Sequence, residues 1–250
     1  MAFNNGSIKY SGNLDGKVGY YRNGKHVLQM KGGFDGARTK TEARYLGTRQ
    51  RQNEFGRCSS LAALLKQSLQ WYLDFVPDVY IFNWIQSGML AVKACDVVSP
   101  KGEKTVLKGL DTAAGRSLMG KYQFNRKCSL SAVFTARVTV DFENGIFSVP
   151  KFTSKGHLRF LPKKDTMTGF QFLLLRIDFD AMVCSVTKSD LFLYTKESGA
   201  IGDLSVAVAI PEGDGLLLGL CFAGYCDAFR DDLLWLRHPS TVMGVVGVGV

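Results

Sequence analysis

The chain has 250 residues, of which 46% are hydrophobic and 21% are charged, a composition typical of a folded globular protein that excludes a largely disordered chain. The formal charge of +9 is uneven, because residues 1–60 hold 11 Lys and Arg against 4 Asp and Glu, a net charge of +7. No uncharged run reaches the ~18 residues that a membrane-spanning helix requires, so we expect no transmembrane anchor.

Residues 1–40 predict an N-terminal arm followed by a basic β-hairpin. The arm, residues 1–15, is rich in Asn and Gly and suits an edge strand. In residues 16–31, apolar and polar side chains alternate on both sides of Asn23-Gly24, the dipeptide most typical of a type I′ turn. We therefore expect two antiparallel strands joined at this dipeptide.

Residues 41–94 predict a layer of two helices. From about residue 42 to 73, apolar side chains recur at three- and four-residue steps, and Thr39 with Glu42 has the spacing of a capping box. Gly56 weakens this helix and marks either a kink or close packing. Pro77 ends it, and a second apolar helical pattern covers 78–93, so the two segments are expected to form a helical hairpin.

Residues 95–250 predict an antiparallel β-sandwich of one or two units, with 150–156 as the boundary if there are two. Short runs of β-branched and aromatic residues alternate with turn signals, which favours a sandwich over a parallel sheet. The candidate strands are 96–98, 105–110, 118–124, 130–142, 146–149, 157–161, 170–179, 190–194, 204–210, 215–227 and 242–250. The predicted fold class is α+β, mainly β, with the hairpin and the helices preceding the β body.

Motifs for catalysis or metal binding are weak, so we expect neither an enzyme nor a bound cofactor. The three histidines, at 26, 157 and 238, lie far apart in the sequence. Asp178 and Asp180 would share one face of a strand and could bind a cation or act as an acid/base pair, but the favoured explanation is that they face water while Ile177 and Phe179 face the core. The six cysteines show no CxxC spacing and predict buried or half-buried thiols. A hydrolase with a site assembled from distant residues is the remote alternative.

The basic N-terminal region is a candidate surface for a polyanion or for an acidic partner protein. Aromatic rings and cations that occur together can stack on bases and neutralise phosphates. This predicted polyanion surface consists of Lys17, Tyr20, Tyr21, Arg22, Lys25, Lys31, Arg38, Arg44, Arg49 and Arg51. Binding of nucleic acid without sequence specificity is therefore the main alternative function.

The C-terminal segment 241–250 is a candidate assembly edge. It carries no side-chain charge and no proline, so it would associate uncontrollably as a free strand edge. We expect it to be covered, either in its own sheet or by a neighbouring chain. The residues of this predicted edge are Val242, Val245, Val246, Val248 and Val250.

Particular residues resemble a group of proteins from Bacteroidetes-type bacteria and their phages, some of which look like phage structural proteins. They are Asn5-Gly6, Leu14–Gly19, Tyr21-Arg22, Gly24-Lys25, Arg38-Thr39, Glu42, Arg49, Arg51 and Phe55, with a strand-and-turn echo from Asp96 to Gly102. The resemblance implies a structural or assembly protein, such as a bacteriophage virion component, that acts by self-association or by contacts with other structural subunits. The start of the chain lacks the pattern of a secretory signal, so we expect synthesis in the cytoplasm and use there or in a virion.

Overall fold

The computed structural model describes residues 2–3, 6, 9–30, 36–161, 166–199, 201–229 and 232–249. The chain divides into two compact units, Met1–Arg49 and Gln50–Val250. Helices account for 31% of the structure and antiparallel strands for 35%, so the predicted α+β class is confirmed.

The first unit contains a small sheet with the strand order β1–β4–β3–β2. Its strands are β1 Ala2–Phe3, β2 Gly12–Leu14, β3 Lys17–Arg22 and β4 Lys25–Met30. Strands β3 and β4 pair from Lys17↔Met30 to Arg22↔Lys25, which leaves Asn23 and Gly24 as the two turn residues. Both have positive φ, 52° and 74°, as a type I′ turn requires. The hairpin lies where the sequence predicts it.

Residues 36–49 of this unit differ from the expected start of the long helix. Thr39 lies inside α1 (Gly36–Thr41), so it does not cap the helix that follows. Glu42 has extended φ and ψ of −74° and 135°, and after it come η1 (Ala43–Tyr45) and α2 (Leu46–Ser68). Arg49 bridges this break, because its Nη1 donates to the carbonyls of Thr39 and Glu42 at 2.8 and 2.9 Å. The capping-box prediction is therefore wrong.

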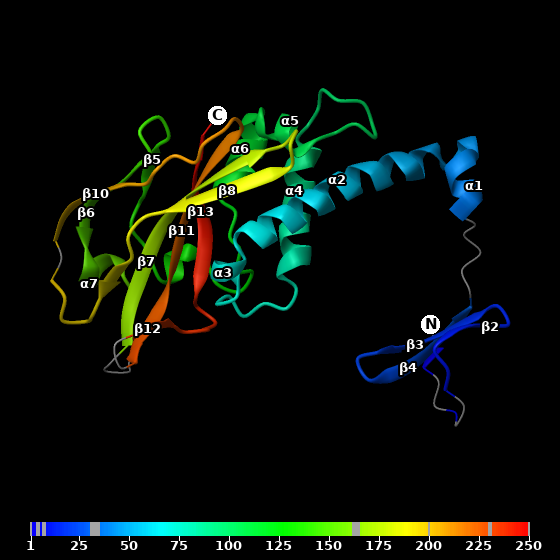
Figure 1. Cartoon of the computed structure of the whole chain (residues 1–250), viewed down its shortest axis with the longest axis horizontal. Helices are drawn as coiled ribbons and strands as arrows, with labels where there is room; N and C mark the ends of the chain where they lie inside the picture. The colour runs from blue at the N-terminus through cyan, green and yellow to red at the C-terminus, as the bar shows by residue number, and fades with distance from the viewer. Residues whose placement is uncertain are drawn as a thin grey trace. The chain divides into compact units, whose positions relative to one another are not determined.

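The second unit is built on two long antiparallel strands, β7 (Thr166–Asp178) and β11 (Leu216–Phe229), paired along almost their whole length. Strands β8 (Val183–Lys188) and β9 (Phe192–Tyr194) share the other edge of β7. Strands β12 (Asp232–Trp235) and β13 (Val242–Gly249) share the other edge of β11. Figure 1 shows these strands as one continuous sheet.

Both faces of the main sheet are buried, which explains the nearly unbroken apolar sequence of β7. Leu173, Leu175 and Ile177 point to one face, and Phe172 and Leu174 point to the other. The first face packs on α2, α3 (Gln70–Leu73), α4 (Ile81–Ala94), α5 (Val106–Leu110) and α6 (Ala113–Gly120). We call this cluster the helix-side core.

The other face packs on a smaller sheet with the order β10–β6–β5. Its strands are β5 (Thr139–Asp141), β6 (Ile146–Thr153) and β10 (Ile201–Ala207), flanked by η2 (Leu130–Ala132) and α7 (Ser154–His157). Figure 1 shows the small sheet and the helices on opposite sides of the main sheet. Because β6 and α7 occupy 146–157, the expected boundary at 150–156 falls within continuous secondary structure.

Several strand predictions between 95 and 161 are wrong. Residues 106–110 form α5 and residues 113–120 form α6, in place of the strands expected at 105–110 and 118–124. Each helix starts at a threonine cap: Thr105 accepts the N–H of Lys108, and Thr112 accepts the N–H of Gly115. Residues 96–98 and 159–161 lie outside strands, and only 139–141 of the expected strand 130–142 pairs in a sheet.

Candidate functional site

A buried aspartate organises the loop between α4 and α5, residues 96–105, which we call the braced loop. Asp96 is 1% exposed. Its Oδ1 accepts the N–H groups of Val98 and Ser99 at 3.1 and 2.9 Å, and its Oδ2 accepts that of Thr105 at 3.0 Å. Burial raises the pKa of this carboxyl, but the hydrogen bonds from Ser99 and Thr105 outweigh it and lower the pKa to about 2. At neutral pH a carboxylate therefore holds the loop closed.

A second carboxylate fixes the braced loop to the helices. Glu54 of α2 accepts the N–H of Gly102 at Oε1 and the Lys93 Nζ of α4 at Oε2, both at 2.6 Å. The side chains of Lys93 and Glu54 are 15% and 7% exposed. The hydrogen bond from Lys93 is the main reason why the pKa of Glu54 is lowered. Gly102 has φ of 98°, and a Cβ there would lie 2.7 Å from the Gln50 Cγ, so only glycine fits.

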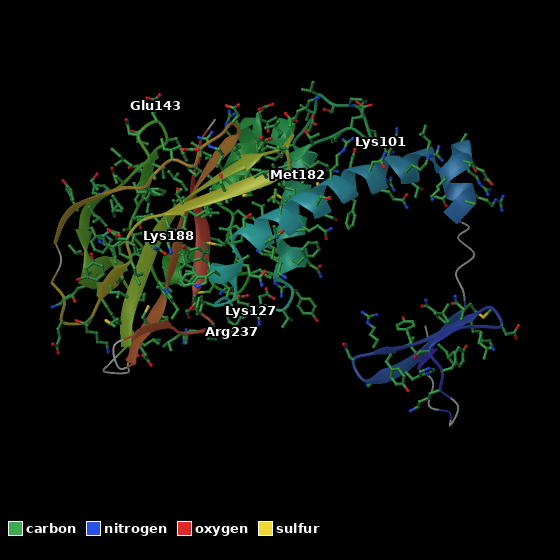
Figure 2. All side chains as sticks on the ribbon, viewed as in Figure 1. Lys101, Lys127, Glu143, Met182, Lys188 and Arg237 are labelled. Carbon is green, nitrogen blue, oxygen red and sulfur yellow. The ribbon has the colours of Figure 1, made fainter. Side chains whose placement is uncertain are left out.

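The start of the braced loop, just after Asp96, exposes two adjacent apolar side chains. Val97 and Val98 are 79% and 83% exposed. Figure 2 labels Lys101 on the same loop. Scattered exposed valines are common on protein surfaces, but here the backbone that carries the pair is fixed by two buried carboxylates. The backbone that carries the pair is therefore held by hydrogen bonds within the chain.

The sequence reading missed this loop by assigning residues 96–98 to a strand. The signal that could have found it is Asp96 followed by Ser99-Pro100-Lys-Gly102, since an aspartate ahead of a Pro and Gly turn tends to accept backbone N–H groups locally. Nothing in the sequence pairs Glu54 with Gly102, which lie 48 positions apart.

A groove of about 350 Å³ lies between α2, the start of α5 and the turn that joins β7 to β8. We call it the α2–α5 groove. It is lined by Arg57, Cys58, Ser60, Leu61, Lys104, Thr105, Val106, Leu107, Phe179, Asp180 and Met182. Burial raises the pKa of the Cys58 thiol, so this cysteine is protonated at neutral pH and is a poor nucleophile.

Three arginines of the predicted polyanion surface are bound within their own unit. Arg38 and Arg44 both pair with Glu42, with Nε to carboxylate oxygen distances of 2.5 and 2.6 Å. Arg49 donates to the backbone carbonyls at the break before α2. Arg51 is exposed and belongs to the second unit. The charge of Arg38 and Arg44 is thus partly neutralised before any ligand binds.

The hairpin residues of the predicted polyanion surface divide between two faces. Arg22 lies opposite Lys25, and Tyr20 opposite Val27, so these four share one face. Tyr21, opposite His26, lies on the other face together with Lys17. Lys17, Tyr21, Arg22 and Lys25 are exposed and Tyr20 is half-buried. Lys31 lies outside the described residues.

The predicted assembly edge is covered by the chain itself. Val242 and Val245 are buried, Val246 and Val248 are half-buried, and Val250 lies outside the described residues. The expectation that this segment is covered is confirmed, because β13 pairs with β11 along one edge. On its other edge the N–H of Phe124 donates to the Met243 carbonyl at 2.8 Å, and the N–H of Val245 donates to the Tyr122 carbonyl at 2.9 Å. These valines therefore build the core of one chain.

Glycines in β13 make room for a neighbouring aromatic ring. A Cβ at Gly247 or Gly249 would lie 3.0 or 2.7 Å from the ring of Phe142, which follows β5. The glycines thus allow close packing of the small sheet on the main sheet.

The aspartates and histidines considered from the sequence as catalytic or metal-binding residues have local structural roles. The Asp178 Oδ1 accepts the N–H groups of Asp180 and Ala181 at 2.9 and 2.8 Å, which closes the turn after β7. His157 and His238 each accept a neighbouring backbone N–H at Nδ1. The six cysteines are free thiols, three buried and three half-buried, as the sequence predicts. Within the described ranges, no group of three or more His, Cys, Asp or Glu side chains could hold a metal ion.

Comparison of the chain with protein-family models, with curated proteins and with solved structures finds no match. Every helix in the described part of the chain is too short or too polar to cross a lipid bilayer.

Proposed function

We propose that this chain is a structural or assembly protein that acts through protein–protein contacts and has no catalytic role. The observation that carries the proposal is the exposed pair Val97 and Val98 on the braced loop. A loop already fixed by Asp96 and Glu54 loses little conformational entropy when it binds, so even two exposed valines contribute usefully to an interface. The partner we propose is a further copy of this chain.

The sequence resemblance supports the same surface, since its second segment, Asp96 to Gly102, coincides with the braced loop. Some proteins of the resembled group look like phage structural proteins, so a bacteriophage virion is the setting we propose. Function there would depend on the shape and stability of the loop.

Self-association tests the proposal directly. Light scattering coupled to size-exclusion chromatography should give a mass that rises above 27.6 kDa with protein concentration. A double variant, Val97→Asp with Val98→Asp, should return the mass to that of the monomer. Val79→Asp is the matched control, because Val79 is 85% exposed and lies outside the loop. A wild-type protein that stays monomeric at every concentration, or equal effects of the two variants, would overturn the proposal.

Polyanion binding by residues 1–60 is the second candidate function. It is favoured by the position of Arg22 opposite Lys25 on the face that also carries Tyr20. If these cations contact phosphates, replacing both with Gln should reduce the slope of log affinity against log salt by about 1.4 for single-stranded DNA. Arg38→Gln is the control, since Arg38 is already paired with Glu42. Fluorescence anisotropy with a labelled oligonucleotide measures the slope, and equal slopes for wild type and the double variant would reject this function.

A further inference from the structure

Apolar and charged side chains both line the α2–α5 groove. Leu61 of α2, Leu107 of α5 and Phe179 of the turn after β7 supply apolar surface, and Arg57 and Lys104 supply two cations against the single carboxylate of Asp180. A volume of about 350 Å³ is within the range of small-molecule sites. The groove therefore has the size and the polarity to hold a small molecule with one charged end.

Met182 shows that the groove is maintained at a local energetic disadvantage. Its φ of 53° is in the left-handed region, which is strained for a residue other than glycine. The side chain is 38% exposed, so it gains little from core packing. Figure 2 labels Met182 at the turn between β7 and β8, and its side chain lines the groove. A glycine would fit the backbone better but would remove this apolar wall.

The charges around the groove favour an anion. Among the described ion pairs, Arg57 and Lys104 have no carboxylate partner. Glu54, the acidic residue that acts on Lys104, already binds Lys93 and Gly102. The lining thus has a net charge of +1, in a chain whose formal charge is +9. A single carboxylate would complement this charge.

We propose that the α2–α5 groove binds a small amphiphilic monocarboxylate. The carboxylate faces Arg57 and Lys104, and the apolar chain packs against Leu61, Phe179 and Met182. This inference does not depend on the proposed assembly role, because Val97 and Val98 do not line the groove.

Isothermal titration of the full chain with octanoate tests the ligand class, with 1-octanol and octylamine as probes that lack the carboxylate. Octanoate should bind saturably with one site per chain, more tightly than either of the other probes. Arg57→Gln should weaken octanoate binding about fivefold and leave octanol binding unchanged, as expected for the loss of one exposed charged contact. Absence of saturable octanoate binding, or octanol binding as tight as octanoate, would overturn the proposal.

Met182→Gly separates binding from stability. It should weaken octanoate binding at least threefold while the melting temperature rises or stays constant, because the strained backbone is relieved. Lys151→Gly is the matched control: Lys151 also has positive φ, 51°, and lies in β6 away from the groove. This control should leave octanoate binding unchanged. Unchanged octanoate affinity in Met182→Gly, or equal weakening in Lys151→Gly, would contradict the assignment.

Discussion

The Glu54 side chain and the Gly102 N–H are joined by a hydrogen bond of 2.6 Å across 48 residues of sequence. The same carboxylate binds Lys93, so one buried group connects α2, α4 and the braced loop. The conformation of the proposed contact surface is thereby coupled to helix packing. Changes in this one carboxylate should affect stability and loop geometry together.

Glu54→Gln should lower the free energy of unfolding by about 1–3 kcal/mol at neutral pH. Glutamine still offers an oxygen to Gly102, but it leaves the largely buried Lys93 without a counter-charge. Because the folded-state pKa of Glu54 is lowered, its stabilising effect is present above its unfolded value of 4.5 and is lost as the pH falls through the folded-state value. Urea unfolding should show a difference in unfolding free energy between wild type and variant that shrinks as the pH falls through the folded-state pKa. The exposed Glu103→Gln serves as the control, and a difference independent of pH would contradict the role of the charge.

Asp96→Asn should loosen the braced loop. The amide cannot accept all three N–H groups, and the pKa difference between 3.8 and about 2 corresponds to a loss of roughly 2 kcal/mol of unfolding free energy at neutral pH. Since the folded-state pKa is depressed, this contribution is present above pH 3.8 and is lost as the pH falls through about 2. Urea unfolding at stepped pH measures it, with the exposed Asp74→Asn as control. Equal stability of Asp96→Asn and wild type at neutral pH would show that the carboxylate does not hold the loop.

Substitution by alanine should have opposite effects on stability at two helix glycines, Gly88 and Gly56. At Gly88 in α4 a Cβ would lie 2.4 Å from the Tyr122 ring, so Gly88→Ala must displace Tyr122 and should destabilise the protein by about 1–3 kcal/mol. At Gly56 in α2 nothing lies within 4 Å, and Gly56→Ala should stabilise by about 0.5–1 kcal/mol. Thermal unfolding of both variants checks the pair. Stabilisation by both substitutions would show that packing around Gly88 is looser than the structure indicates, and destabilisation by both would contradict the open surroundings of Gly56.

Elements encoded by local signals could be predicted from the sequence. The turn at Asn23-Gly24 is specified by two residues that accept positive φ. Strands β7 and β11 are long apolar runs that could be recognised without knowing their partners, although their burial on both faces appears only in the structure. The need to cover the β13 segment also follows from the sequence, because an uncharged edge strand would aggregate.

Elements that depend on distant contacts could not be predicted. Residues 105–120 contain β-branched and aliphatic runs that suit a strand, but two threonine caps and packing on the helix-side core make them α5 and α6. The braced loop depends on Glu54, whose partners come from two other segments. The α2–α5 groove combines three segments separated by about 45 and 75 residues. No periodic pattern in the sequence connects segments so far apart, so the groove could not be predicted.

Gly24→Val should disturb the hairpin and leave the second unit intact. No atom lies within 4 Å of a Cβ at this position, so the effect comes from the φ of 74°, which β-branched residues avoid. Gly24→Asn is the matched control, because asparagine tolerates positive φ. Amide chemical shifts of residues 17–30 should change in the Val variant and remain near wild type in the Asn variant. Unchanged shifts in the Val variant would contradict the type I′ turn.

The valines of β13 differ in burial although they share one strand. Val242 is 0% exposed and belongs to the core between the two sheets, whereas Val248 is half-buried. Val242→Ala should lower the unfolding free energy by about 2 kcal/mol and Val248→Ala by less than about 1 kcal/mol, because a cavity forms only where the neighbours enclose the lost methyl groups.

Deletion of residues 242–250 extends this test of β13. The truncated chain should lose the edge partner of β11 and three buried apolar side chains, those of Val242, Met243 and Val245, so we expect a lower melting temperature and aggregation on light scattering. Urea unfolding of the two point variants decides the matter even if the truncated chain is insoluble. Equal effects of Val242→Ala and Val248→Ala would contradict the difference in burial, and a truncated protein with unaltered melting temperature and mass would show that this segment is a dispensable tail.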